Sequence, residues 1–349
     1  MTEKSKKTLA YLLIAALFVL FVQVALGGIT RLTGSGLSMT EWKLIQGTIP
    51  PLNEVAWQEK FELYKTIPQY QLLNKGMSLS EFKSIFFWEW AHRVWGRFGF
   101  VFILGIFVVM GIAKKLDRQA VFRFGILLFL YFCQGLMGWF MVMSGLSELT
   151  SVSHYRLAAH LVLALFLFAY ILWWVADLLV DNKQKIVHPS LRKYAWIITG
   201  IMLLQIVFGA FMSGLKAAPN YPSFPDMNGQ FIPDNLFFMK PLWINFFENI
   251  TTIQFTHRGI AYLLCVLIMI YWWHARKINA PKIFKSAINL LPIILVIQVT
   301  LGVLVLLNSH RGIPVGLGIF HQAFGLILLS VMLFGDFLYG RDSAFESLR

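Results

Sequence analysis

The stretch LAYLLIAALFVLFVQVALGG, residues 9–28, contains no charged side chain. An α-helix needs about 20 mainly apolar residues to cross the hydrocarbon core of a membrane, so this stretch predicts a membrane-spanning helix. It follows Lys4, Lys6 and Lys7 and ends in small residues, as a cleavable signal peptide would. Its apolar part is longer than the core of a signal peptide. We therefore interpret it as a retained span.

Similar runs recur along the chain and predict an all-α, polytopic membrane protein of eight transmembrane helices. Of the 349 residues, 58% are hydrophobic and 13% are charged, a balance that excludes an ordinary soluble domain. Cys133 and Cys265 each lie within an apolar run, which argues against a disulfide framework or a thiolate metal site. The predicted spans are residues 9–28, 84–112, 122–144, 156–180, 194–213, 251–274, 286–307 and 316–338.

Basic residues predict the orientation of these helices. The net charge is +13, and in a membrane protein excess lysine and arginine marks cytoplasmic loops more often than a nucleic-acid surface. Basic clusters flank alternate connections, which predicts cytoplasmic termini and two long outer connections, residues 30–83 and 214–250. In the first of these, Ser78 and Glu81 have the spacing of a capping box, which predicts a helix start. The clusters are Lys4, Lys6 and Lys7; Lys114, Lys115 and Arg118; Lys183, Lys185, Arg192 and Lys193; and Arg276, Lys277, Lys282 and Lys285.

A repeated motif divides the chain into two halves. Each odd-numbered span carries Gln-x-x-x-Gly near its outer end, and each even-numbered span carries one histidine near its outer beginning. The repeat predicts two tandem four-helix bundles, residues 1–182 and 183–349, related by pseudo-twofold symmetry along the membrane normal. The glutamine and glycine pairs are Gln23 and Gly27, Gln134 and Gly138, Gln205 and Gly209, and Gln298 and Gly302, and the histidines are His92, His160, His257 and His321.

The four repeated histidines are candidate ligands of haem iron. A strongly polar side chain inside a span is costly and by default marks a functional site. Two histidines per half fit the two axial ligands of one haem, and they fit zinc poorly because zinc takes three or four protein ligands. The alternative is that the histidines only form hydrogen bonds between helices. Each is followed four positions later by a small residue, beside which we expect the flat macrocycle to lie: Gly96, Ala164, Ala261 and Gly325.

Charged side chains near the histidines predict how haem would be held and used. Arg93 and Arg258 directly follow histidines, and we expect their guanidinium groups to bind haem propionates. Aligning EWAHR with QFTHR places Glu89 opposite Gln254, so only the first half keeps an ionisable group at this position. The asymmetry predicts chemistry in the first half, with Glu89 moving protons, and electron transfer in the second. A plain ion pair between Glu89 and Arg93 is the structural alternative.

Four stretches resemble haem A synthase, in the subgroup that includes the mitochondrial and related proteobacterial enzymes. They are GGITRLTGSGLSMTEWKLIQGTIPPLNE (27–54), YQLLNKGMSLSEFKSIFFWEWAHRVWGR (70–97), YPSFPDMNGQFIP (221–233) and FTHRG (255–259). The resemblance implies an enzyme that oxidises a ring methyl of haem O to a formyl group, making haem A for cytochrome oxidase assembly. It implies that His257 and His321 bind a permanent haem b, that His92 and His160 belong to the haem O site, and that Glu89 is essential. Some relatives have a cysteine pair in outer loops, and this chain has none there.

The resemblance also implies partners and a location. Besides haem O and its product haem A, candidate partners are the haem O synthase (protohaem farnesyltransferase), cytochrome oxidase assembly proteins, an electron carrier that the sequence does not identify, and a second copy of the chain. No nucleic acid is expected. The chain begins without an Arg- and Ser-rich leader, which favours a bacterial inner membrane, with the haem sites near its outer face. Two other classes stay open: a membrane bis-haem b-type electron-transfer protein and a non-enzymatic haem carrier.

Overall fold

The computed structural model describes residues 1–42, 46–146 and 150–340, which are helical and contain no β-sheet. Within these ranges, eight helices are long and apolar enough to cross a membrane. The predicted all-α membrane protein and its eight spans are therefore confirmed. The helices are α1 (Glu3–Leu32), α4 (Leu79–Ile112), α5 (Arg118–Leu146), α6 (His154–Leu179), α7 (Pro189–Gly214), α9 (Ile250–Ala275), α10 (Lys282–Leu307) and α11 (Val315–Phe337).

Local sequence signals fix where several of these helices begin. At the start of α4 the predicted capping box is confirmed: Ser78 Oγ accepts from the Glu81 N–H at 3.3 Å, and Glu81 Oε2 accepts from the Ser78 N–H at 2.8 Å. Such bonds satisfy backbone donors that the first helical turn leaves unpaired. Proline opens α7 at Pro189 and precedes α10 and α11, where its missing N–H costs no helical hydrogen bond.

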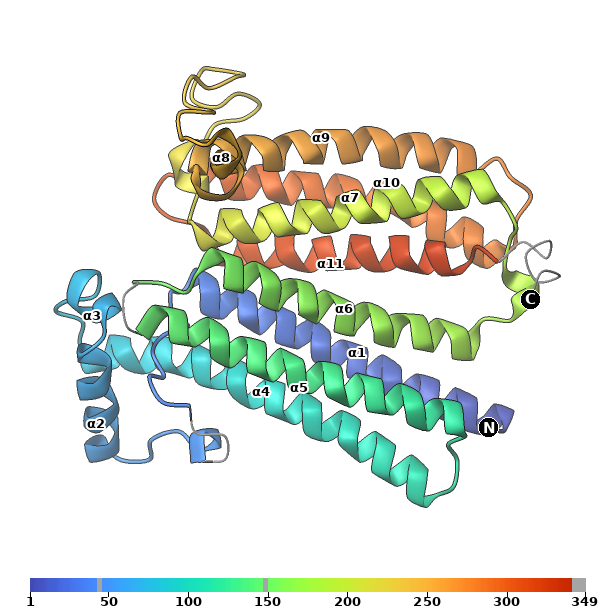
Figure 1. The fold of residues 1–349 in the computed structure, drawn as a ribbon, viewed down its shortest axis with the longest axis horizontal. Helices are drawn as coiled ribbons and strands as arrows, with labels where there is room; N and C mark the ends of the chain where they lie inside the picture. The colour runs from blue at the N-terminus through green and yellow to red at the C-terminus, as the bar shows by residue number, and fades with distance from the viewer. Residues whose placement is uncertain (43–45, 147–149, 341–349) are drawn as a thin grey trace. The chain divides into compact units, whose positions relative to one another are not determined.

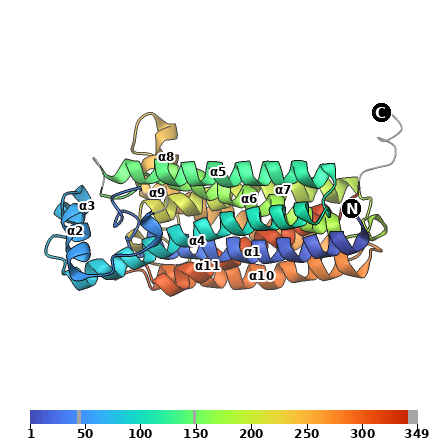
Figure 2. The ribbon, with the colours of Figure 1, turned by 90° about the horizontal axis from the view of Figure 1, so that it is seen from below.

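The chain divides into two compact units. The first contains Met1–Ser5, Ala15–Phe168 and Ser213–Leu215, and the second contains Lys6–Ile14, Ala169–Met212 and the residues from Lys216 onward. Long helices run lengthwise beside one another within each unit, among them α1, α4 and α5 in the first and α7, α9, α10 and α11 in the second (Figures 1 and 2). The division into halves at residue 182 stays a prediction.

In the first unit, the long connection after α1 folds into short helices at the N-terminal end of α4 (Figures 1 and 2). These are η1 (Gln46–Thr48), α2 (Glu54–Lys65) and α3 (Pro68–Leu72). Phe61, Tyr64, Phe82 and Phe86 form their buried core, with the Phe61 and Phe82 rings stacked at 5.0 Å between centroids. Burying each such side chain stabilises the fold by about 1.5–3 kcal/mol. The short helices of this connection therefore pack against the N-terminal end of α4 through a shared hydrophobic core.

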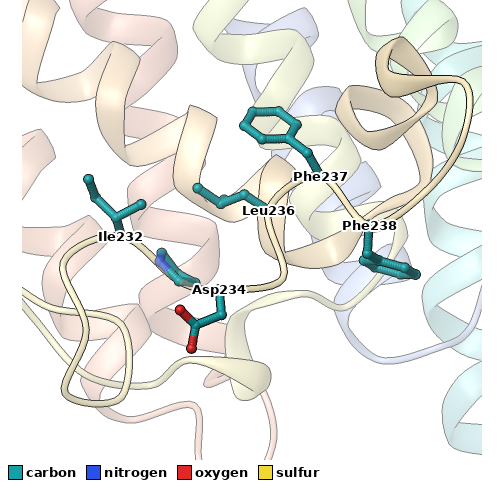
Figure 3. A pocket seen from close by; sticks show the side chains of 6 residues that line it. Ile232, Asp234, Leu236, Phe237 and Phe238 are labelled. Atoms are coloured by element: carbon teal, nitrogen blue, oxygen red, sulfur yellow. The ribbon is translucent and has the colours of Figure 1, made fainter.

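In the second unit, buried amides organise the connection between α7 and α9. Asn245 donates to the Met239 carbonyl at 2.9 Å and accepts from its N–H at 3.1 Å, and Asn249 donates to the Asn235 carbonyl at 2.8 Å. This connection contains an open pocket of about 440 Å³, lined by residues 232–234 and 236–238. Figure 3 shows the side chains that line it. Asp234 is its charged lining residue, and no histidine lines it. The short helices here and before α7 are η2 (Asn182–Gln184), η3 (Ala218–Asn220), η4 (Leu242–Ile244) and α8 (Asn245–Glu248).

Candidate haem sites

Each of the four repeated histidines packs against the glycine of one Gln-x-x-x-Gly motif. The ring carbon Cε1 lies so close to the glycine that any side chain there would crowd the imidazole. We call each set of one glutamine, one glycine and one histidine a histidine seat; the four seats join α1 to α4, α5 to α6, α7 to α9 and α10 to α11. A Cβ added to the glycine would lie 3.2 Å from Cε1 for Gly27 and His92, 3.2 Å for Gly138 and His160, 3.3 Å for Gly209 and His257, and 2.8 Å for Gly302 and His321.

The glutamine of each seat also contacts the histidine. In three seats the side-chain amide nitrogen Nε2 approaches a ring nitrogen, and in the fourth the main chain makes the contact. Sequence reasoning had singled out these glutamines without a role. The distances are 3.2 Å from Gln23 Nε2 to His92 Nδ1, 3.3 Å from Gln134 Nε2 to His160 Nε2, 3.4 Å from Gln205 Nε2 to His257 Nε2, and 3.1 Å from His321 Nδ1 to the Gln298 carbonyl oxygen.

Two of the small residues that follow the histidines lie beside a seat glutamine. A Cβ at Gly96 would lie 3.1 Å from Gln23 Nε2, and one at Gly325 would lie 3.2 Å from Gln298 Nε2. The expectation that a macrocycle lies against the helix at these positions stays a prediction, and the structure places the seat glutamine beside both glycines. A small residue indicates close approach without identifying what approaches.

Each unit contains two of the four histidines: His92 and His160 lie in the first, and His257 and His321 lie in the second. Nδ1 of His160 and Nδ1 of His257 are buried without a hydrogen-bond partner. Among the described residues, no three or more His, Cys, Asp or Glu side chains group closely enough to hold a metal ion. Each unit thus has two imidazoles, one of which has a ring nitrogen without a partner, and two imidazoles are the number of protein ligands that a haem iron can take.

In the first unit, Glu89 and Arg93 form a buried ion pair that holds the long connection. Glu89 is only 2% exposed, and its Oε1 lies 2.5 Å from a terminal nitrogen of Arg93. Its Oε2 accepts from Ser38 Oγ at 2.8 Å and from the Met39 N–H at 2.7 Å. Arg93 in turn donates to the carbonyl oxygens of Met39 at 3.0 Å and Glu41 at 3.1 Å. The carboxylate is therefore held in one orientation, one helical turn before His92.

The corresponding residues of the second unit hold its long connection without a buried charge pair. Arg258 donates to the carbonyl oxygens of Asp226 at 2.7 Å and Tyr221 at 2.8 Å. Gln254, which is fully buried, donates to the same Tyr221 carbonyl at 3.0 Å. The side-chain oxygen of Gln254 has no partner.

These contacts bear on two predictions without deciding them. The terminal nitrogens of Arg93 and Arg258 bind loop carbonyls, although Nε of Arg258 is buried without a partner. Propionate binding by these arginines stays a prediction. The ion pair that was the structural alternative for Glu89 is present, and a catalytic role for the same carboxylate stays a prediction.

Part of this site was within reach of the sequence. The register between Gln-x-x-x-Gly and histidine recurs in four pairs of successive spans, so each glutamine could have been assigned to the next histidine. Ser38 and Met39 could not have been found in this way. The Met39 contact uses a backbone N–H, which every residue except proline possesses, so no side-chain pattern marks it.

Together the fold and the seats define a polytopic α-helical membrane protein with paired intramembrane histidines. The model of the family described as cytochrome oxidase assembly protein matches residues 10–333, and the chain belongs to that family. A protein named Heme A synthase from Parvibaculum lavamentivorans is 44% identical over 331 residues, which cover 95% of this chain and 94% of that protein. Proteins of the same name from Flavobacterium psychrophilum and Nitrosomonas eutropha are 43% identical over 332 residues and 40% identical over 337 residues. These alignments cover 94% of this chain and 96% of the first protein, and 95% of this chain and 93% of the second. The resemblance found in four stretches of sequence is therefore confirmed.

Proposed function

We propose that this protein is a haem A synthase, which oxidises a ring methyl group of haem O to the formyl group of haem A. The observation that carries the proposal is the 44% identity over 95% of the chain to a protein of that name. Membership of the cytochrome oxidase assembly protein family agrees with it, because haem A would be delivered to that oxidase. The two partly buried histidines in each unit support the proposal, because they are candidate ligands for haem iron.

We further propose that the two halves divide the work. Residues 1–182 bind the substrate haem O through His92 and His160, and residues 183–349 hold a permanent haem b through His257 and His321. Haem b, when bound, supplies a carrier that accepts and passes on single electrons. The difference at Glu89 and Gln254 supports this division, since only the substrate half has a carboxylate beside its histidine.

The proposed role of Glu89 is to accept protons. Oxidising a methyl carbon to an aldehyde releases protons as well as electrons, and a buried site needs a group that takes them up. The two oxygens of a carboxylate offer about four acceptor positions. Arg93, Ser38 and the Met39 N–H each donate a hydrogen bond to the Glu89 carboxylate and hold it in one orientation. A position is therefore left for the proton, and the carboxylate need not reorient to take it.

The proposed location is a bacterial inner membrane, with both termini cytoplasmic and the seats near the outer face. The alternation of basic and nonbasic connections supports this orientation. In each unit the seats lie toward the helix ends that carry the long connection. Haem O could then enter from the lipid and meet its histidines near that surface. Haem O synthase, oxidase assembly proteins and an electron carrier are the proposed partners.

Haem extraction tests the function and its division. We would express the full chain in a bacterium that makes haem O but no haem A, purify it, and separate the extracted haems by chromatography. The wild type should yield haem B and haem A. His257→Ala should lose haem B, whereas His92→Ala should keep haem B and yield no haem A. A wild-type protein that returns only unchanged haem O would contradict the enzyme and favour a carrier.

A further inference from the structure

In three of the four histidine seats the glutamine side chain faces the ring, and in the fourth the main chain does. The side-chain amides of Gln23, Gln134 and Gln205 lie beside ring nitrogens of their histidines, and Gln134 Nε2 also donates to the backbone carbonyl of His160 at 3.1 Å. On α10, the backbone carbonyl of Gln298 accepts from His321 Nδ1 at 3.1 Å. The second unit therefore contains one seat in which the side chain faces the ring and one in which the main chain does.

In the side-chain seats, the amide presents its nitrogen to the ring and leaves its oxygen buried without a partner. This holds for Oε1 of Gln23, Gln134 and Gln205; Oε1 of Gln298 is also buried without a partner, but its amide does not face the ring of His321. An unsatisfied buried acceptor costs about 1–3 kcal/mol. A half-turn of the terminal carboxamide exchanges the positions of its oxygen and nitrogen. The oxygen would then accept a hydrogen bond from a ring N–H, which satisfies both groups at once.

This arrangement is the one that a metal-bound imidazole requires. A neutral imidazole carries one N–H and one lone pair, and the metal takes the nitrogen with the lone pair. The other nitrogen keeps its hydrogen and needs an acceptor, which fixes the ring and makes it a better electron donor. In the seat of His257, the nitrogen facing Gln205 is Nε2 and the nitrogen without a partner is Nδ1. The glutamine thus engages one side of the ring and leaves the other side for a ligand.

We propose that Gln205 is a positioning residue for the haem of the second half: its side-chain oxygen accepts the N–H of His257 and so increases electron donation from this ligand to iron. This inference rests on the proposed haem b site. It adds that the two histidines that would hold that haem are tuned differently, His257 by a side chain and His321 by the main chain.

Gln298 provides a matched control within the same site. It has the same residue type and the same motif position as Gln205, and its histidine is proposed to bind the same iron. The acceptor for His321 is the backbone carbonyl of residue 298, which no substitution at that position removes. The Gln298 amide instead lies against Gly325. Replacing the side chain at residue 298 should therefore change packing and leave the hydrogen bond to His321 in place.

The test measures the reduction potential of haem b in the purified full-length protein. Gln205→Met removes the acceptor with little change in volume, and Gln298→Met is its control. We expect a positive shift of the haem b midpoint potential in Gln205→Met, because weaker donation from His257 stabilises ferric iron less. Gln298→Met should keep the wild-type potential. The electron paramagnetic resonance signal of the ferric haem should change in the first variant only.

Equal shifts in both variants, or no shift in a Gln205→Met protein that retains haem b, would overturn the inference. If Gln205→Met releases the haem, Gln205→Glu decides, because it retains an acceptor oxygen. The proposal is supported if Gln205→Glu retains haem b and its midpoint potential equals or lies below the wild-type value. A positive shift of the potential, or loss of haem, in Gln205→Glu contradicts the proposal. A wild-type protein without haem b would instead be a failure of the proposed function, which these measurements distinguish.

Discussion

The two units hold their long connections with the same helix positions but different chemistry. In the first, buried Glu89 pairs with Arg93, and both bind residues 38–41. In the second, Arg258 and the uncharged Gln254 both donate hydrogen bonds to the Tyr221 carbonyl. The acidic residue near Arg258 is Asp226, which lies on the loop and not on the helix. An amide is thus sufficient to help hold a connection. The second unit holds its connection without a carboxylate at this helix position, which supports the proposed use of Glu89 in proton transfer.

The largest expected effect comes from making the first unit resemble the second. In Glu89→Gln, the side-chain oxygen can still accept hydrogen bonds from the loop, but the amide cannot take up a proton. We expect haem A formation to fall by about 10²-fold or more, while haem b content is unchanged. Chromatography of extracted haems measures both quantities.

The reciprocal variant, Gln254→Glu, is a test of the second connection: it removes the N–H that donates to the Tyr221 carbonyl, so we expect it to lower the thermal unfolding midpoint. Haem A formation by Glu89→Gln at the wild-type rate would show that the difference between the units has no catalytic meaning. A parallel loss of haem b would point to a structural role for the carboxylate.

Stability should also distinguish the two arginines. Arg93→Met leaves a buried carboxylate unpaired, which should cost about 3–5 kcal/mol of the free energy of unfolding. Arg258→Met loses hydrogen bonds to carbonyl groups, at about 1–3 kcal/mol. Thermal unfolding in detergent should therefore rank the midpoints as wild type, then Arg258→Met, then Arg93→Met.

A double variant checks the reason for this ranking. Glu89→Gln combined with Arg93→Met removes both charges, so it should be more stable than Arg93→Met alone. If the double variant is the less stable of the two, the unpaired carboxylate is not the source of the loss.

A smaller effect is expected at the glycines of the seats, because the distance between an added Cβ and the histidine ring differs from seat to seat. A Cβ would lie 2.8 Å from His321 in Gly302→Ala and 3.3 Å from His257 in Gly209→Ala. Crowding a packed site in this way costs about 1–3 kcal/mol, and we expect the larger loss of bound haem in Gly302→Ala. The ratio of haem to protein measures it. Gly200→Ala on α7 is the control, since a Cβ there meets no atom within 4 Å. Equal haem loss in the two seat variants would contradict the seat geometry.

The smallest expected effect is a pH dependence of the second connection. The Ser223 hydroxyl, the Gly229 N–H and Arg258 hold the pKa of the Asp226 carboxyl below its ordinary value of 3.8. Since the pKa is lower in the folded protein, the carboxylate stabilises the loop above about pH 4, and this is lost as the pH falls through the folded pKa. Hydrogen exchange of the 221–230 amides, corrected for intrinsic rates, should show opening at low pH.

The control for this effect is Asp226→Asn, which carries no titrating group at that position. Its 221–230 amides should therefore lack the additional opening below about pH 4. Opening of the same size in both proteins would assign the pH dependence to another residue.

The sequence determined the spans, their starts and the candidate ligands. Backbone hydrogen bonds of a membrane helix are satisfied within the helix, so about 20 apolar residues are enough to predict one. The capping box at Ser78 is equally local, because both partners lie within one turn. The repeated histidines and the EWAHR segment could be read directly, and they led to the family to which the chain belongs.

Only the tertiary structure decided which groups meet. It joined each seat glycine to a histidine, placed Gln23 beside Gly96, and brought the Met39 N–H to Glu89. These contacts join residues distant in the chain, and some use backbone atoms common to nearly every residue. A hydrogen bond depends on the position and direction of both groups, whereas a sequence pattern gives only the residue types and their spacing along one helix.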